Sequence, residues 1–190
     1  MIKQTREFGS VKSADQLFSV AHHGTRLELV RGVVQVRSPA GSEHGWIASR
    51  ILIRLGAYVE ANDLGKTFAA ETGFLIEVDP DTVRAPDAAY VSHENLASAP
   101  PSSSYLQVAP DLVVEVVSPN DASTDLEAKA EQWIEAGTKI VLVADPKNQT
   151  LRVYKSKAQI EVLRSGEEFA SGEVCDAWII SVNEIFDIRD

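Results

Sequence analysis

Three charged residues of this chain stand inside or beside apolar segments, where a charge needs a partner. Glu115 lies in the middle of the β-branched run 112–117, Asp87 opens a second apolar run after Pro86, and Lys129 falls on the flank of a predicted helix. A buried carboxylate is costly to desolvate unless something compensates it. A metal ion, a lysine or a second acid would compensate Glu115.

Together these groups would suit the hydrolysis of a phosphodiester. Two carboxylates in one site repel each other, so bringing Asp87 and Glu115 together implies a cation between them. Such oxygen-rich sites favour Mg²⁺ or Mn²⁺ over zinc. A lysine beside the ion, as Lys129 would be, can orient a water, lower its pKa or stabilise a pentavalent phosphate. The sequence has no Gly-rich phosphate loop, zinc-type Cys/His spacing or Gly-x-Ser-x-Gly motif.

Ordinary structural interpretations of the same residues stay open. Glu115 could face solvent on a one-sided strand, and Asp87 could be a strand-start aspartate. Lys129 could extend past Trp133 to water. Glu28 stands between two leucines and would face away from them, which is typical of an exposed strand position. His44, in the first turn of a predicted helix, could be a local cap or a solvent-facing ring.

The elements around Glu115 predict a strand–helix–strand unit. Residues 110–119 form an apolar run with turn residues at both ends, as expected for a buried central strand. Thr124 and Glu127 have capping-box spacing, and Gly137 suits the C-terminal end of the helix between them. The buried strand 139–144 follows. This order predicts a right-handed crossover and parallel pairing.

The other segments predict a mixture of strands and helices on either side of this unit. Ser13 and Gln16 resemble a capping box, with a helix to about His22 ended by Gly24. Arg31-Gly32 suggests a hairpin turn, and apolar spacing predicts a helix over 42–62. The remaining expected elements are strands at 66–70, 73–78 and 83–91, a loop at 98–104, a hairpin at 151–163, core residues at 178–180 and a helical turn at 181–186.

Composition restricts the class of protein further. A chain of 190 residues is long enough for a single domain with a substantial core. We expect a cytoplasmic protein, because there is one cysteine, no signal-type apolar block and no apolar run of about 20 residues. The formal charge of −10 argues against a non-specific nucleic-acid binder. Lys and Arg are nevertheless concentrated in residues 26–66, where six stand against four acids.

The order of these motifs resembles the Uma-two family of the PD-(D/E)xK restriction-endonuclease-like superfamily. The resemblance spans about residues 13–155, and its motifs are the run 27–32, the helix start at His44, the segment 84–87, the strand 110–119 and the segment from 125 to Pro146. It implies an α/β fold with a mixed sheet: a restriction-endonuclease-like αβββαβ core with an N-terminal helix and hairpin, in a single domain over 1–190.

The resemblance also implies roles for individual residues. Asp87 matches the metal-binding aspartate, and Glu115 matches the acid of the acid-x-lysine pair. Val117 stands where that lysine is expected, and Lys129 is the matching position on the following helix. Glu28 matches an N-terminal acid that would complete the metal site. His44 matches a recurrent histidine, which we treat as an accessory residue.

Three functional hypotheses follow. The first is a DNA endonuclease that depends on Mg²⁺ or Mn²⁺, acting as a homodimer so that two sites address two strands. The second is a nuclease-like fold that no longer cuts and serves as a binding or regulatory module; the negative charge and Val117 favour it. The third is a metal-dependent hydrolase of a small phosphorylated molecule. None of the three involves a membrane.

Overall fold

A computed structural model describes residues 8–20, 26–102, 104–118 and 123–187 of the chain. The helices are α1 (Ala14–Val20), α2 (Ser42–Ala61), α3 (His93–Ser98), α4 (Ser123–Glu135) and α5 (Val182–Phe186), with a 3-10 turn at Gly172–Cys175. The strands are β1 (Arg26–Val30), β2 (Val33–Arg37), β3 (Gly65–Ala69), β4 (Phe74–Glu77), β5 (Thr82–Arg84), β6 (Ala88–Ser92), β7 (Leu112–Val116), β8 (Ile140–Asp145), β9 (Thr150–Ser156), β10 (Gln159–Leu163), β11 (Glu168–Ala170) and β12 (Ile179–Ser181).

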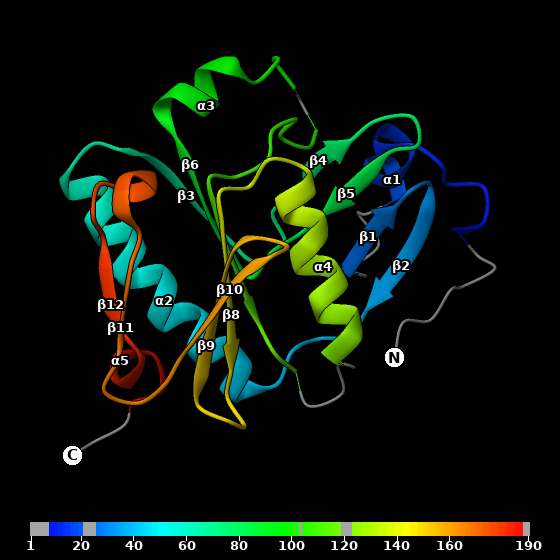
Figure 1. Ribbon diagram of the computed structural model, residues 1–190. Helices are drawn as coiled ribbons and strands as arrows, with labels where there is room; N and C mark the ends of the chain where they lie inside the picture. Colours follow the sequence, from blue (N-terminus) through cyan, green and yellow to red (C-terminus); the bar gives the residue numbers. More distant parts are fainter. Residues whose placement is uncertain (1–7, 21–25, 103, 119–122, 188–190) are drawn as a thin grey trace.

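A mixed six-stranded sheet runs through the middle of the molecule, in the order β10-β9-β8-β7-β6-β3 (Figure 1). Strand β7 lies inside this sheet, antiparallel to β6 and parallel to β8, and α4 connects the parallel pair. The predicted strand–helix–strand unit is therefore confirmed. Along the chain, α2, β3, β6, β7, α4 and β8 follow the predicted αβββαβ order, with β4 and β5 inserted between β3 and β6 and α3 between β6 and β7.

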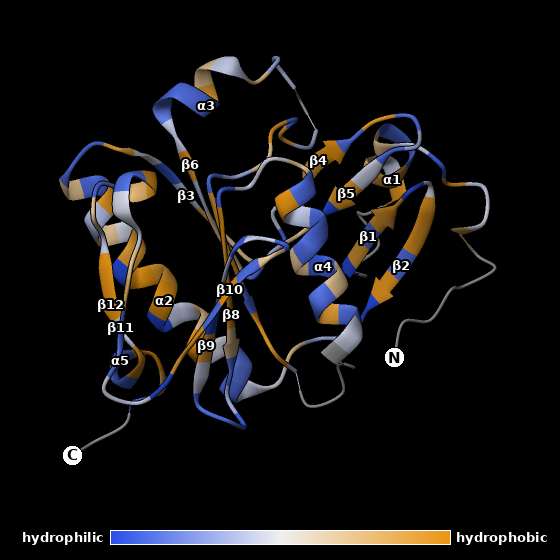
Figure 2. Cartoon of the chain, viewed as in Figure 1, coloured by the Kyte–Doolittle hydropathy of each residue, from blue (hydrophilic) through white to orange (hydrophobic). Residues whose placement is uncertain are grey.

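Helices cover the two faces of the central sheet. On one face, α2 packs its apolar stripe against the strands, through Ile47, Ile51 and Leu55, and α5 with β11 and β12 extends the same core. On the other face, α4 packs through Leu126, Ala130 and Trp133. The hydropathy colouring shows this apolar interior between the layers (Figure 2). Since Val113 belongs to the core under α4, period-two alternation turns Glu115 toward α4 as well.

A smaller four-stranded sheet, in the order β2-β1-β5-β4, lies beside α4 and carries α1 (Figure 1). The two-residue turn Arg31-Gly32 has φ values of 47° and 72°, as a tight hairpin turn requires, which confirms the predicted hairpin. Its register pairs Glu28 with Gln35 and Arg26 with Arg37. The hairpin thus presents a fixed set of charged and polar side chains toward α4.

Several segment predictions need correction. The expected strand 83–91 is broken into β5 and β6 around Pro86, and α3 was not predicted. Helix α4 begins at Ser123, so Thr124 lies inside the helix and is not its N-cap. Ile179 is 55% exposed and is not a core residue, although Trp178 and Ile180 are buried.

Other segment predictions agree with the structure. Gln16 N donates to Ser13 Oγ at 3.3 Å and Ser13 N donates to Gln16 Oε1 at 3.2 Å, so the first capping box forms. The predicted end of that helix, at His22 and Gly24, lies outside the described residues. No helix in the described ranges has the length and apolar character needed to cross a membrane.

Candidate active site

Asp87 is fixed against the end of β7 by its own backbone and side chain. Its N–H donates to Val114 O at 3.0 Å, and its Oδ2 accepts from Val116 N at 2.8 Å. Pro86, just before it, has no N–H to donate to a neighbouring strand and lies in the break between β5 and β6. As a result the carboxylate is buried next to the strand position that follows Glu115.

Glu115 is a buried glutamate with only 3% of the residue exposed. Its Oε1 accepts from Trp133 Nε1 at 2.9 Å, and its two oxygens lie 2.8 and 2.9 Å from Lys129 Nζ. Burial raises the pKa of Glu115, and the negative charges of Asp87 and Glu28 add to this; the charge of Lys129 only partly offsets them. Burial, with the charges of these two acids, thus outweighs the ion pair with Lys129 and disfavours the ionised form of Glu115.

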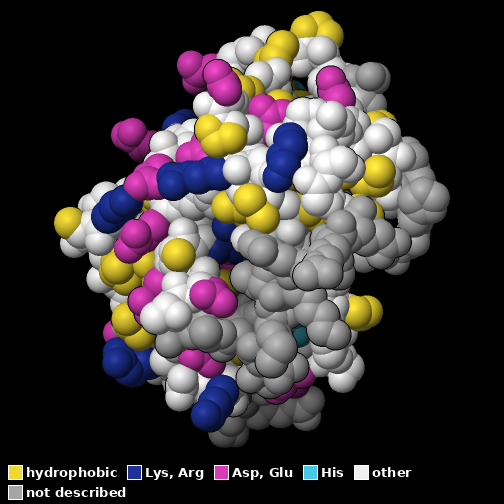
Figure 3. All heavy atoms as spheres, turned by 90° about the vertical axis from the view of Figure 1, so that its right-hand side faces the viewer, with side chains coloured by type: hydrophobic (Ala, Val, Ile, Leu, Met, Phe, Trp, Pro, Cys, Tyr) yellow, Lys and Arg dark blue, Asp and Glu magenta, His cyan; other side chains and the backbone are white. Residues whose placement is uncertain are grey.

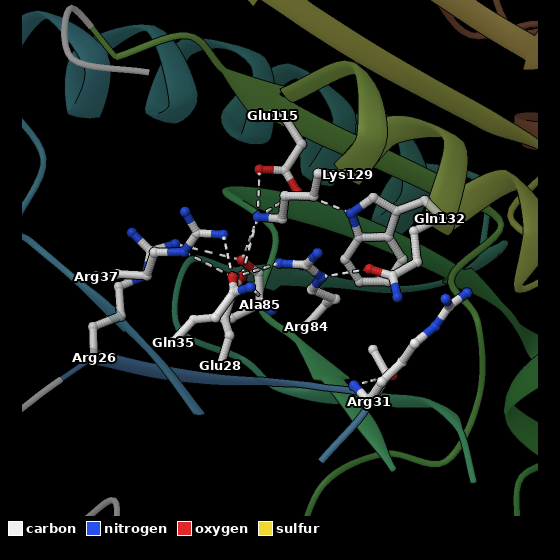
Figure 4. A network of polar contacts seen from close by, with 12 residues as sticks. Arg26, Glu28, Arg31, Gln35, Arg37, Arg84, Ala85, Glu115, Lys129 and Gln132 are labelled. Atoms are coloured by element: carbon white, nitrogen blue, oxygen red, sulfur yellow. Dashed lines mark hydrogen bonds and ion pairs between the residues drawn. The ribbon is translucent and has the colours of Figure 1, made fainter. Parts of the chain in front are cut away.

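Lys129 joins the two glutamates. Its buried Nζ also lies 3.1 Å from Glu28 Oε1 and donates to Ala85 O at 3.3 Å. The ammonium thus sits between carboxylates from β1 and β7 (Figure 4). The alternative that Lys129 extends to solvent is wrong, because the residue is only 8% exposed.

Glu28 is the anchor of a cationic cluster. Its Oε2 accepts from Arg37 Nε at 2.8 Å and from Arg84 Nη1 at 2.9 Å, and its Oε1 accepts from Ala85 N at 3.2 Å (Figure 4). Burial alone would raise the pKa of Glu28, but the charges of Lys129, Arg84 and Arg37 outweigh it and hold that pKa far below its usual range. Glu28 is therefore not the exposed strand residue that its position between leucines suggested.

His44 is paired with Asp87. Its Nε2 lies 3.1 Å from Asp87 Oδ2, and its side chain is 9% exposed. Burial would lower the pKa of His44, but the hydrogen bond and charge of Asp87 raise it. Burial would raise the pKa of Asp87, and the hydrogen bond and charge of His44 lower it. His44 is thus neither a local cap nor a solvent-facing ring.

All five residues singled out in the sequence line one cavity of about 310 Å³. They come from β1, from the first turn of α2, from the break between β5 and β6, from β7 and from α4. Arg26 and Arg37 line the same cavity, so its wall carries four carboxylates, counting Asp125, and three permanent cations. The arrangement gathers carboxylates, an ammonium and two guanidinium groups around one cavity.

A family model described as "Uma2: Putative restriction endonuclease" matches residues 14–183. The chain belongs to the Uma2 family. The match confirms the resemblance found in the sequence and continues past residue 155, where that resemblance ended. Membership of the Uma2 family supports a nuclease-like function.

A solved structure resembles this Uma2 chain in fold. It is the crystal structure of "a putative nuclease belonging to DUF820" from Anabaena variabilis ATCC 29413, with a TM-score of 0.73 and 18% sequence identity. The match covers 85% of this chain and 89% of that chain. At this identity the similarity shows the fold, and the mixed α/β architecture is confirmed. No curated protein matches the chain.

In this Uma2 site a divalent ion would fit with two carboxylate ligands, Asp87 and Glu115, better than with three. Asp87 Oδ1 has only a long contact, 3.4 Å, with Arg26 Nη2, and the pKa of Glu115 is raised first by burial and then by the charges of Asp87 and Glu28. Both carboxylates have capacity for a cation. Mg²⁺ is commonly held by one or two carboxylates plus water and substrate phosphate. Within the described ranges no three His, Cys, Asp or Glu residues are grouped as an enclosing metal site.

Several polar residues of the Uma2 site were not singled out in the sequence. Arg26, Arg37, Arg84, Gln132 and Trp133 all bond within it; for example, Arg84 Nε donates to Gln132 Oε1 at 2.8 Å (Figure 4). The Arg31-Gly32 turn fixes the hairpin register and could have placed Arg26 and Arg37 beside Glu28. The long-range bonds of Arg84 and Gln132 leave no comparable signal in the sequence.

Proposed function

We propose that this chain is a divalent-metal-dependent nuclease that hydrolyses phosphodiester bonds in DNA. The observation that carries the proposal is Lys129 Nζ, held between Glu28 and Glu115 in the cavity that Asp87 also lines. Asp87 and Glu115 would hold Mg²⁺ or Mn²⁺, which would supply a Lewis acid for the phosphate and lower the pKa of a water.

The chain's own residues would position the substrate and handle charge. The ammonium of Lys129 projects into the cavity beside Glu115, where it can stabilise the negative charge that develops on a phosphate under attack. Glu28 keeps Lys129 in place, because its other oxygen is anchored by Arg37 and Arg84. In this proposal Lys129 does the work of the lysine that Val117 replaces.

The test is cleavage of DNA by purified protein with Mg²⁺ or Mn²⁺, and its loss in variants of the site. We expect Glu115→Gln, Asp87→Asn and Lys129→Ala each to reduce the rate at least about a hundredfold. Glu131→Gln is the matched control, since Glu131 lies on the same helix as Lys129 with a side chain 44% exposed. If folded Glu115→Gln and Lys129→Ala cleave DNA at the wild-type rate, this cavity is not the site of cleavage.

A second candidate function is a nuclease-like module that binds without cutting. It is favoured by the partners of Asp87, since Arg26 and His44 contact its two oxygens and partly balance its charge. Isothermal titration with Mn²⁺ separates the two. Heat of binding that disappears in Asp87→Asn supports the nuclease, and no binding at millimolar Mn²⁺ supports the module.

The assembly state and substrate class belong to the same proposal. A homodimer would let two sites address both strands of a duplex, and light scattering on the purified protein would give the mass. A panel of small phosphate esters would separate a nuclease from a hydrolase of small phosphorylated molecules.

A further inference from the structure

A second cavity of about 500 Å³ adjoins the first, and the proposed cleavage does not use it. The two cavities share lining residues, among them Arg26, Arg37 and His44. The second continues along α2 and the end of β3, where its wall is small or apolar: Gly45, Ala48, Leu52, Ala69 and Ala70. Its volume is in the range of small-molecule sites, about 300–1,000 Å³.

Charge changes along the combined cavity. Arg26 and Arg37 are register partners across the β1–β2 hairpin, and both line the two parts together with Asp87, whereas Glu71 lines only the second. Arg26 makes long contacts, 3.4 Å to Asp87 Oδ1 and 3.5 Å to Ala85 O, and its buried Nε has no hydrogen-bond partner among the described residues. Two guanidinium groups thus stand against one carboxylate at the junction, which favours an anion there, and Glu71 disfavours an anion in the second cavity.

Gly45 is an exposed position of α2 that borders the open side of the second cavity. It lies within α2, where glycine is the least favourable residue after proline, and its backbone does not need a positive φ. A Cβ added there would meet no atom within 4 Å. Next to it, His44 has a side chain more than nine-tenths buried, and its Nδ1 lacks a hydrogen-bond partner among the described residues. Position 45 is thus open to a ligand or to a larger side chain, while His44 beside it is buried.

We infer that the second cavity takes the base of an unpaired nucleotide whose phosphate lies at Arg26 and Arg37. The inference rests on the proposed function and names its substrate class. A nucleobase is flat and largely apolar, with N–H groups at its edge that a carboxylate such as Glu71 can accept from. A base within a continuous duplex is stacked and paired, so it cannot enter a pocket unless it is flipped out. The preferred substrate is therefore single-stranded or carries an unpaired nucleotide.

Filling the second cavity tests where the base lies. We would measure binding of a short fluorescein-labelled single strand, and of the blunt duplex of the same sequence, with Ca²⁺ present. Wild type should bind the single strand more tightly, and Gly45→Leu should weaken that binding about tenfold or more. It should leave duplex binding within about twofold, since a paired base does not use the cavity. Gly45→Ala, which leaves most of the space open, should bind as wild type does.

Matched variants control for the helix and for charge. Ala57→Leu adds a leucine at an exposed position of the same helix and should leave both affinities unchanged. Arg26→Gln should reduce the slope of log K against log salt for the single strand by about 0.7. Arg31→Gln, on the same hairpin but with a side chain 67% exposed and outside both cavities, should leave the slope unchanged.

The outcomes separate this inference from the proposed function. The inference is overturned if folded Gly45→Leu binds the single strand as wild type does. It is also overturned if wild type prefers the duplex or binds no single strand. Either result counts even if DNA is cut. If the expected binding pattern appears but neither substrate is cut with Mg²⁺ or Mn²⁺, the nucleotide site stands and the proposed hydrolysis fails.

Discussion

Glu28 and Glu115 are two buried glutamates that share one lysine, yet their surroundings shift their pKa values in opposite directions. Burial raises the pKa of Glu115, together with the charges of Asp87 and Glu28, whereas the cations Lys129, Arg84 and Arg37 lower that of Glu28 despite its burial. Such divergence separates the roles of two acids in one site. Glu28 acts as an ionised anchor for Lys129, and Glu115 is the acid suited to accept a further cation.

Replacing Glu28 should therefore damage the fold more than metal binding. Glu28→Gln removes the negative charge that Arg37, Arg84 and Lys129 surround, and breaking a buried ion pair from one side costs about 3–5 kcal/mol. We expect urea unfolding at pH 7 to show a loss of about 3 kcal/mol or more. Mn²⁺ affinity should change little under conditions where the variant is folded.

Glu77→Gln is the control for this change, because Glu77 is a partly exposed acid on β4 of the same four-stranded sheet. The prediction would be contradicted by a Glu28→Gln variant that keeps wild-type stability but no longer binds Mn²⁺. That would make Glu28 a metal ligand, as the family resemblance implied.

At the level of single residues, the sequence identified the charged groups but not most of their partners. Glu115 is recognisable because an acid interrupts an apolar strand, and Lys129 because it flanks the buried arc of its helix. Trp133 lies on the same helix as Lys129, but its N–H bond to Glu115 was not predicted. Buried tryptophan usually places its N–H on an acceptor, so a nearby strand acid was the available signal.

At the scale of elements, the position of α4 lets Lys129 occupy the space that a lysine at position 117 would also reach. Residues 115 and 117 of a strand point to the same face, and α4 covers that face of β7. A lysine on the underside of α4 can thus reach the same space as one at position 117, where Val117 stands. The apolar periodicity predicts α4, but the break between β5 and β6 depends on long-range bonds of Asp87 to β7 and was not predicted.

Asp111 joins three elements away from the candidate site and gives a pH-dependent prediction. Its Oδ2 accepts from Ser92 N at 2.7 Å and from Asn95 Nδ2 at 3.3 Å, and its Oδ1 lies 2.7 Å from Lys139 Nζ. Burial alone would raise the pKa of Asp111, but the hydrogen bonds from Lys139 and Ser92 outweigh it and lower that pKa. A lowered pKa stabilises the fold above the unfolded-state value, about 3.9, and this stabilisation disappears as the pH falls through the folded-state pKa.

Asp111→Asn should consequently lower the free energy of unfolding by about 1–3 kcal/mol at pH 7. The difference from wild type should begin to narrow below about pH 4, where Asp111 becomes protonated in the unfolded state, and should close as the pH falls through the lower pKa of the folded state. Urea unfolding over a pH series measures both effects. Asp63→Asn is the comparison, since the Asp63 side chain is 95% exposed and should give little difference. If the difference in the free energy of unfolding between Asp111→Asn and wild type stays constant down to acid pH, packing and not the charge of Asp111 accounts for the lost stability.

At the scale of the whole molecule, charge opposes the binding of DNA. The chain has a formal charge of −10, and on the face that bears the smaller sheet Lys and Arg side chains are interspersed with Asp and Glu (Figure 3). The candidate cavity follows the same pattern, with four carboxylates against three permanent cations. Since phosphate contacts supply most of the affinity for nucleic acid, a polyanion gains little here from the protein alone.

DNA binding should therefore depend on a divalent cation, and Asp87 should set that dependence. In EDTA we expect wild type to bind a labelled oligonucleotide at least about tenfold more weakly than in Ca²⁺ at matched ionic strength, because one added divalent charge reverses the balance of the cavity. Asp87→Asn removes a carboxylate from that wall, so it should bind more tightly than wild type in EDTA and gain little from Ca²⁺. Asp63→Asn removes the same charge from an exposed position and should behave as wild type does. Equal affinity of wild type in EDTA and in Ca²⁺ would show that the arginines alone hold the phosphates, and that the carboxylates do not take up an ion on binding.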